Sequence, residues 1–114
     1  MTIKEPSFTI GIEEEYLLVD QDTRDLVQEK PPALFTKLEE SLRGQVSPEF
    51  LRSQIEIGTR VCKTIQEARD ELTHLRATVG SLSGEFGLAP IASSTHPFAP
   101  VSYTHLTLPT TPYV

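Results

Sequence analysis

Phe8-Thr-Ile-Gly-Ile-Glu-Glu-Glu-Tyr-Leu-Leu-Val19 is an apolar stretch with three consecutive acids at its centre. The two-residue period of a strand places Glu14 on one face with the even-numbered apolar residues, and this face is expected to pack on a core. Glu13 and Glu15 then lie side by side on the other face, roughly 6–7 Å apart along the strand. Three acids are unfavourable in the middle of a strand, and a residue choice that breaks a local rule often marks a functional site. The alternative is a solvated edge strand with a negatively charged face.

Two amphipathic helices are predicted after this strand. Pro31 and Pro32 open the first helix, since proline is tolerated in a first helical turn, and Gly44 is placed to end it. Thr64 and Glu67 have the spacing of a capping box at the start of a second, longer helix. Further strands are expected at residues 26–27, 45–58 and 88–92. A hairpin-like start and strands with one polar face favour an α+β fold with a largely antiparallel sheet and packed helices.

The second strand region contains two more acids. If this region is regular from Leu51, Glu56 lies on a polar face that is backed by an apolar one. Glu49 is seven residues from Glu56, so a regular strand would place the two on opposite faces. Only a bulge or bend between Pro48 and Arg52 would bring Glu49 round. The sequence therefore leaves Glu49 as either a solvated acid or a metal ligand.

Composition limits the class of protein. The 114 residues suggest one small domain. A net charge of −6 argues against non-specific nucleic-acid binding. No stretch approaches the ~20 apolar residues of a membrane span, and the start lacks an apolar signal region, so no membrane partner and a cytoplasmic location are expected. Cys62, the single cysteine, permits no internal disulfide and is interpreted as a buried structural thiol.

Residues 100–114 differ from the rest of the chain, because they contain no Asp, Glu, Lys or Arg and no usable periodicity. Residues 101–110 can be encoded by a DNA string that resembles the transposase adapter used to prepare sequencing libraries. The hypothesis is that residues 1–99 are native and that the sequence from about Pro100 is adapter read-through, which would be excluded from fold reasoning. The alternative is a natural terminal tail rich in proline and threonine.

Three blocks in order resemble the carboxylate–amine ligases of the bacterial glutamate–cysteine ligase type 2 family. They are Gly11-Ile-Glu-Glu-Glu-Tyr16, Ser53-Gln-Ile-Glu-Ile-Gly-Thr-Arg-Val-Cys62 and Ser94-Thr-His-Pro-Phe-Ala99. The resemblance spans residues 8–99 and corresponds to the N-terminal part of a family member. Arg60 departs from the pattern, since the family often has glycine there.

The resemblance implies an ATP-dependent ligase with a glutamine-synthetase-like catalytic sheet. In such an enzyme ATP phosphorylates the side-chain carboxylate of glutamate, and an amine, cysteine's in the named activity, displaces the phosphate. The implied magnesium ligands are Glu13, Glu15 and Glu56, with Glu49 as a fourth. The donor chemistry agrees, because Mg²⁺ takes oxygen ligands, commonly one or two carboxylates with phosphates and water. Strand positions are also rigid enough to hold such ligands.

Three further residues are given roles, and of these only His96 rests on the resemblance. Arg52 flanks Glu56 and is expected to contact a carboxylate or phosphate of the substrate, since guanidinium groups bind both bidentately. The alternative is an arginine that is exposed or paired with an acid of the chain. His96, which follows a strand end, is expected to contact substrate or nucleotide. Glu14 is expected to be paired with a cation or amide donors, because an unpaired buried carboxylate is costly.

Two other classes of protein remain open. One is a non-catalytic α+β module that binds a divalent cation or small ligand, and the other is an interaction domain with an acidic surface strand. In the ligase interpretation the sheet is incomplete. Its exposed edge is expected to favour self-association, and a homo-oligomer is left open.

Overall fold

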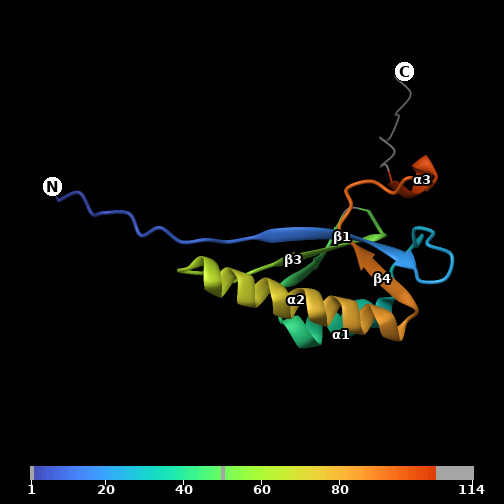
Figure 1. The fold of residues 1–114 in the computed structure, drawn as a ribbon, viewed down its shortest axis with the longest axis horizontal. Coiled ribbons are helices and arrows are strands. Elements are labelled where there is room, and N and C mark those ends of the chain that lie inside the picture. The colour runs from blue at the N-terminus through green and yellow to red at the C-terminus, as the bar shows by residue number, and fades with distance from the viewer. Residues whose placement is uncertain (1, 50, 105–114) are drawn as a thin grey trace, which may run out of the picture.

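The computed structural model describes residues 2–49 and 51–104. The elements follow one another as β1 (Glu13–Asp20), α1 (Pro32–Leu42), β2 (Val46–Pro48), β3 (Gln54–Gly58), α2 (Ile65–Glu85), β4 (Leu88–Ile91) and α3 (Val101–Thr104). The four strands form one sheet in the order β2-β3-β1-β4, and each neighbouring pair is antiparallel. Helices α1 and α2 lie together on one side of this sheet (Figure 1). The predicted α+β class with an antiparallel sheet is confirmed.

The main core lies between the sheet and the two helices. Alternate residues of β1 and β3 point into it, as the two-residue period predicts, and they meet the apolar stripes of α1 and α2. Its buried members are Tyr16, Leu18, Leu34, Leu38, Leu42, Val46, Ile55, Ile57, Leu75, Val79 and Leu88.

The outer face of β1, away from the helices, is divided into two halves. Glu13 and Glu15 make its first half acidic and remain exposed. Leu17 and Val19 make its second half apolar, and they are buried in a smaller cluster with Leu26. The sheet therefore presents charged oxygen atoms directly beside a covered apolar patch.

The predicted helix boundaries hold. The Thr64 hydroxyl accepts the backbone N–H of Glu67 at 3.1 Å, which caps α2. The Glu67 carboxylate accepts the N–H of Lys63 at 2.6 Å, one residue before the amide that a capping box would use. Gly44 follows α1 with a φ of 81°, a left-handed conformation that favours glycine.

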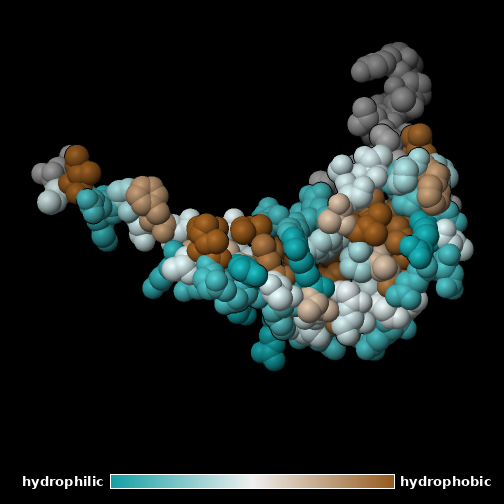
Figure 2. Space-filling model, viewed as in Figure 1, coloured by the Kyte–Doolittle hydropathy of each residue, from teal (hydrophilic) through white to brown (hydrophobic). Residues whose placement is uncertain are grey.

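The first strand begins later than predicted. It was expected from Phe8, but β1 starts at Glu13, opposite the last residue of β3, Gly58. Ahead of it Ile10 forms an isolated bridge with Cys62, and Phe8 is 87% exposed rather than packed on a core. The residues before Glu13 lie beyond the end of their neighbouring strand and form an arm that projects from the body, with apolar side chains on its surface (Figure 2).

Two other expectations about strands need correction. Leu26 forms only an isolated bridge with Val19. The region 45–58 is not one strand but a hairpin of β2 and β3, which pair from Val46 opposite Ile57 to Pro48 opposite Ile55.

Cys62 is buried, as predicted, and its thiol lies 3.3 Å from the carbonyl oxygen of Arg60. Residues 101–104 form the short helix α3, whereas the rest of the proposed adapter tail, residues 105–114, lies outside the described residues. Among the described helices, none combines the length and the apolar character needed to cross a membrane.

Candidate metal centre

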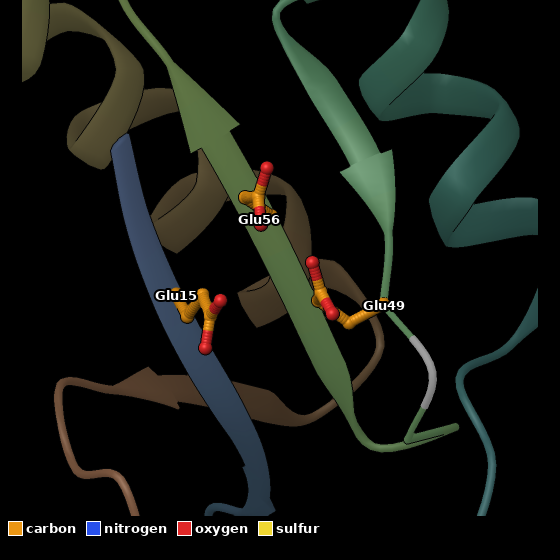
Figure 3. Close-up of side chains that lie close together, drawn as sticks. All are labelled: Glu15, Glu49 and Glu56. Atoms are coloured by element: carbon orange, nitrogen blue, oxygen red, sulfur yellow. The ribbon is translucent and has the colours of Figure 1, made fainter. Parts of the chain in front are cut away.

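Three carboxylates from different parts of the sheet come together on its outer face. Glu15 lies in β1, Glu56 lies in β3 and Glu49 follows the end of β2. One oxygen atom from each lies within 4.8 Å of the others. Figure 3 shows Glu49 reaching across β3 toward Glu56, with Glu15 on the neighbouring strand. Three carboxylate oxygens at this spacing form a donor set that a small hard cation could share.

The strand pairing explains why Glu15 and Glu56 meet. They are directly opposite each other in the antiparallel β1–β3 pair. Directly opposite residues of such a pair share a face, with their Cβ atoms about 4.5–5.5 Å apart. Like charges in these positions repel each other and destabilise the strand pairing. A cation bound between the two carboxylates would offset this repulsion.

The hairpin explains how Glu49 joins them. Ser47 lies opposite Glu56 in the β2–β3 pair, so the two share a face. Glu49 is two residues beyond Ser47, and the period of the strand returns it to that face. The seven-residue spacing would separate the two acids only in a single continuous strand. The sequence required a bend between Pro48 and Arg52 for Glu49 to reach Glu56. The structure has this bend, because the chain reverses direction between β2 and β3.

The electrostatics of the cluster follow from this crowding. A hydrogen bond with Glu49, then burial, then the charges of Glu49, Glu13 and Glu15 raise the pKa of Glu56 from 4.5 to about 7. The sheet therefore holds Glu56 among carboxylates that favour its protonated form, and a bound cation would reverse that preference.

Glu13 lies on the same face, one alternate position along β1. It is opposite Gly58, and its Cγ atom would lie 3.8 Å from a Cβ built on that glycine. Glu13 is not one of the three residues whose oxygens lie within 4.8 Å of one another. The structure thus brings together Glu15, Glu49 and Glu56 and leaves Glu13 at their margin, where its charge still acts on Glu56.

A hollow of about 260 Å³ adjoins Glu15. Its lining includes Gln54 at the start of β3 and the segment Ala92-Ser93-Ser94 that follows β4. Ser94 opens the third block of the family resemblance, but neither serine was predicted as a site residue, because they are two of many polar loop residues. Their relevance depends on β4 pairing with β1, which carries the segment to the acidic face.

Glu14 points to the other side of the sheet and is paired there. Arg76 of α2 binds its carboxylate with two guanidinium nitrogens, Nε at 2.9 Å from Oε2 and Nη2 to Oε1. The Tyr16 hydroxyl also donates to Glu14. The hydrogen bond from Arg76 lowers the pKa of Glu14 despite partial burial, whereas burial and the bond to Glu14 raise the pKa of Tyr16 to about 12. The predicted pairing with a cation is confirmed.

Arg76 was missed as the partner of Glu14. The one signal in the sequence is its place beside Leu72 and Leu75, at the margin of the apolar stripe of α2. A cation at the margin of a buried stripe is within reach of an acid on the facing strand.

Arg52 lies on the surface at the turn before β3. Its side chain is 76% exposed, and its guanidinium is 3.9 Å from the carboxylate of Glu29. Its carbonyl oxygen accepts the backbone N–H of Lys30 at 3.2 Å. This residue is thus beside an acid of the same chain, and contact with a ligand stays a prediction.

His96 is buried and bonded through both ring nitrogens. Nδ1 accepts the backbone N–H of Phe98 at 3.3 Å, so Nε2 carries the proton and donates to the carbonyl of Arg24 at 2.8 Å. The residue is only 5% exposed, and its ring packs edge-on against Phe98. In this conformation it fixes the segment after β4 to the turn after β1, and the expected contact with nucleotide or substrate stays a prediction.

Comparison with known proteins gives consistent matches. A family model described as glutamate-cysteine ligase family 2 (GCS2) matches residues 9–112. A protein of Jannaschia sp. (strain CCS1) is 57% identical over 98 residues, which cover 86% of this chain and 26% of that protein. A protein of Rhodospirillum rubrum is 52% identical over 101 residues, covering 85% of this chain and 26% of that protein. Both relatives carry the provisional name glutamate–cysteine ligase 2. The chain spans about a quarter of the length of these curated relatives.

Proposed function

The chain belongs to glutamate–cysteine ligase family 2, and from that premise we propose that its acidic cluster holds magnesium for an ATP-dependent ligase. The observation that supports this most directly is the convergence of Glu15, Glu49 and Glu56 within 4.8 Å. The donor set fits the ion, because all three groups are hard oxygen ligands and two of them, Glu15 and Glu56, lie on paired strands of the sheet. The crowding that raises the pKa of Glu56 is also consistent with the proposal, because a cation held among these carboxylates would offset their mutual repulsion.

The proposed reaction forms a γ-glutamyl amide. The side-chain carboxylate of glutamate attacks the terminal phosphorus of ATP, ADP leaves, and an acyl phosphate forms. The nitrogen of an amine such as cysteine then attacks the acyl carbon, the C–O bond breaks so that phosphate leaves with that oxygen, and the nitrogen loses a proton to solvent. When bound, magnesium neutralises the charge on the phosphates and holds them in place.

In this proposal the residues of the chain hold the ion and orient the substrate. Glu15, Glu49 and Glu56 must be deprotonated to accept the ion, and their three chain segments fix the direction from which it is held. Glu13 adds negative charge at the margin of the site. The hollow beside Glu15 supplies the amide of Gln54 and the hydroxyl of Ser94, which can donate hydrogen bonds to a polar substrate. The Ser93 hydroxyl donates to the carbonyl oxygen of Thr95 at 2.8 Å. A glutamine-synthetase-like arrangement of the whole catalytic sheet is part of the same proposal.

The described sheet is only part of the proposed catalytic domain. The chain covers about a quarter of its relatives, and the remaining strands of the proposed enzyme would carry further nucleotide and substrate groups. We therefore expect no ligase turnover from these 114 residues alone, while cation binding at the cluster should persist.

Titration of the chain with Mg²⁺, followed by NMR with and without ATP, tests the proposal. Chemical-shift changes are expected at residues 13–15, 49 and 56, and ATP should tighten the binding. Glu56→Gln should weaken the response strongly. Glu40→Gln is the matched control, because it removes an exposed acid of α1 on the helix side of the sheet.

If Mg²⁺ causes the same chemical-shift changes at the same affinity with and without ATP, the alternative of a non-catalytic cation-binding module is favoured. A response that is equal in Glu56→Gln and Glu40→Gln would contradict the metal site itself. ATP turnover by the 114 residues, abolished by Glu15→Gln, would contradict the expected inactivity.

A further inference from the structure

Glu14 separates the two acids of β1 that face the proposed metal site. Glu13 and Glu15 point away from the helices, whereas Glu14 points toward α2, where Arg76 binds both of its oxygen atoms. The Glu14 side chain is 20% exposed and that of Arg76 is 60% exposed. The pair is therefore open to solvent on one side and is not a core contact.

The pair is better suited to fixing geometry than to adding stability. Ion pairs that are partly exposed contribute little to folding. A bidentate guanidinium–carboxylate contact is directional, because both groups are planar and two parallel hydrogen bonds set their orientation. The Tyr16 hydroxyl adds a third bond to the same carboxylate. Glu14 is thereby held from both α2 and its own strand.

The register of β1 decides whether the outer face carries carboxylates. A slip of one residue would turn every side chain of the strand to the opposite face. Glu13 and Glu15 would then face the helices, and Glu14 would replace them on the outer face. Because residues 13–15 are all glutamate, a slip of one residue places the same residue type on each face there. The local sequence therefore does little to distinguish the two registers.

We infer that the Glu14–Arg76 pair is a positioning contact that sets the register and orientation of β1 and so presents Glu13 and Glu15 to the metal site. This inference rests on the proposed function for the identity of the ligand. Its physical content, that Arg76 holds β1 in place against β3, can be measured without any metal.

Magnesium affinity gives the first test, because simple charge effects and positioning predict opposite signs. Arg76→Gln removes a positive charge near the cluster, so Coulomb attraction alone would strengthen cation binding. Loss of positioning would weaken it, by about 10-fold if the pair acts as outer-shell partners of metal ligands do. Arg76→Lys keeps the charge but not the bidentate geometry, so an intermediate loss of magnesium affinity is expected.

Arg69→Gln is the matched control. Arg69 lies on α2 two turns before Arg76 and lines the same surface groove. Within the described residues its guanidinium group has no ion pair or hydrogen bond. Removing its charge should leave magnesium affinity unchanged or slightly higher. A Glu14→Gln/Arg76→Gln double variant keeps the net charge and should lose affinity as Arg76→Gln does.

Amide hydrogen exchange of the metal-free chain gives the second test. Exchange at residues 13–17 and 54–58 is expected to accelerate in Arg76→Gln and to stay at the parent rate in Arg69→Gln. Equal exchange in both variants would overturn the inference. So would tighter Mg²⁺ binding by Arg76→Gln.

These outcomes separate the inference from the proposed function. If the parent chain does not respond to Mg²⁺, the proposed function fails, and the exchange data alone decide whether Arg76 holds β1. If the parent chain binds Mg²⁺ and Arg76→Gln binds it equally well, the inference fails and the metal site stands.

Discussion

Magnesium binding by the acidic cluster is expected to depend on pH over an unusually high range for carboxylates. Glu56 must lose its proton to become a ligand, and crowding by Glu49 raises its pKa to about 7. Its deprotonated fraction then rises about tenfold between pH 6 and pH 8, and the apparent affinity for Mg²⁺ should rise by the same factor. An ordinary glutamate cluster would show almost no change over this range.

The raised pKa of Glu56 also determines whether the free energy of unfolding rises or falls with pH. In the metal-free chain the folded state holds the Glu56 proton more tightly than the unfolded state does. The free energy of unfolding therefore falls as pH rises from the ordinary value of 4.5 to about 7. Added Mg²⁺ should offset this loss, because it binds the folded, deprotonated form.

Isothermal titration calorimetry in buffers of different ionisation enthalpy measures the protons released on binding. We expect about 0.9 proton per ion at pH 6 and about 0.1 at pH 8. Glu49→Gln removes the largest cause of the shift, so proton release near pH 6 should disappear along with part of the affinity. Glu40→Gln should keep the parent profile. Equal affinity at both pH values, with no proton release, would refute the reasoning about Glu56.

Three further predictions concern the stability of the fold, measured by urea unfolding. Leu38→Ala should cost about 2–5 kcal/mol, because the side chain is 0% exposed in the core between α1 and the sheet. Thr64→Ala should cost about 1 kcal/mol through loss of the α2 cap, whereas Thr73→Ala, an exposed mid-helix control, should change stability by less. Ser83→Ala should be neutral or stabilising, because the buried Ser83 hydroxyl has no hydrogen-bond partner within the described residues. A large loss in Ser83→Ala would show that its hydroxyl is bonded after all.

The sequence predicted those features that depend on local periodicity. Alternation along one strand was enough to assign Glu14 to the helix side and Glu15 to the outer face. Cap chemistry was enough to start α2 at Thr64. In each case the deciding interactions join residues close together in the chain, so the pattern of residue types carries the information.

Glu49 could not be placed in the same way, because alternation applies only within one strand. The side on which it lies depends on where the chain reverses between β2 and β3. That turn is held by a distant contact: both the backbone N–H and the Nζ of Lys30 bind the carbonyl of Arg52, at 3.2 Å and 3.0 Å. The bonds from Arg76 to Glu14 and from His96 to Arg24 also span 62 and 72 residues. Tertiary structure, not sequence pattern, selects these partners.

If the acidic cluster binds a cation as proposed, that binding is coupled to the folding of the segments that carry its ligands. Glu15 and Glu56 meet only when β1 pairs with β3, and Glu49 joins them only when the β2–β3 hairpin closes. Without a cation, bringing three carboxylates within 4.8 Å opposes both steps through charge repulsion. A cation that binds all three favours both steps, so part of its binding free energy stabilises the sheet. Because β2 has only three residues and lies at the edge of the described sheet, the hairpin is the part of the fold that should gain most protection from amide exchange when Mg²⁺ is added.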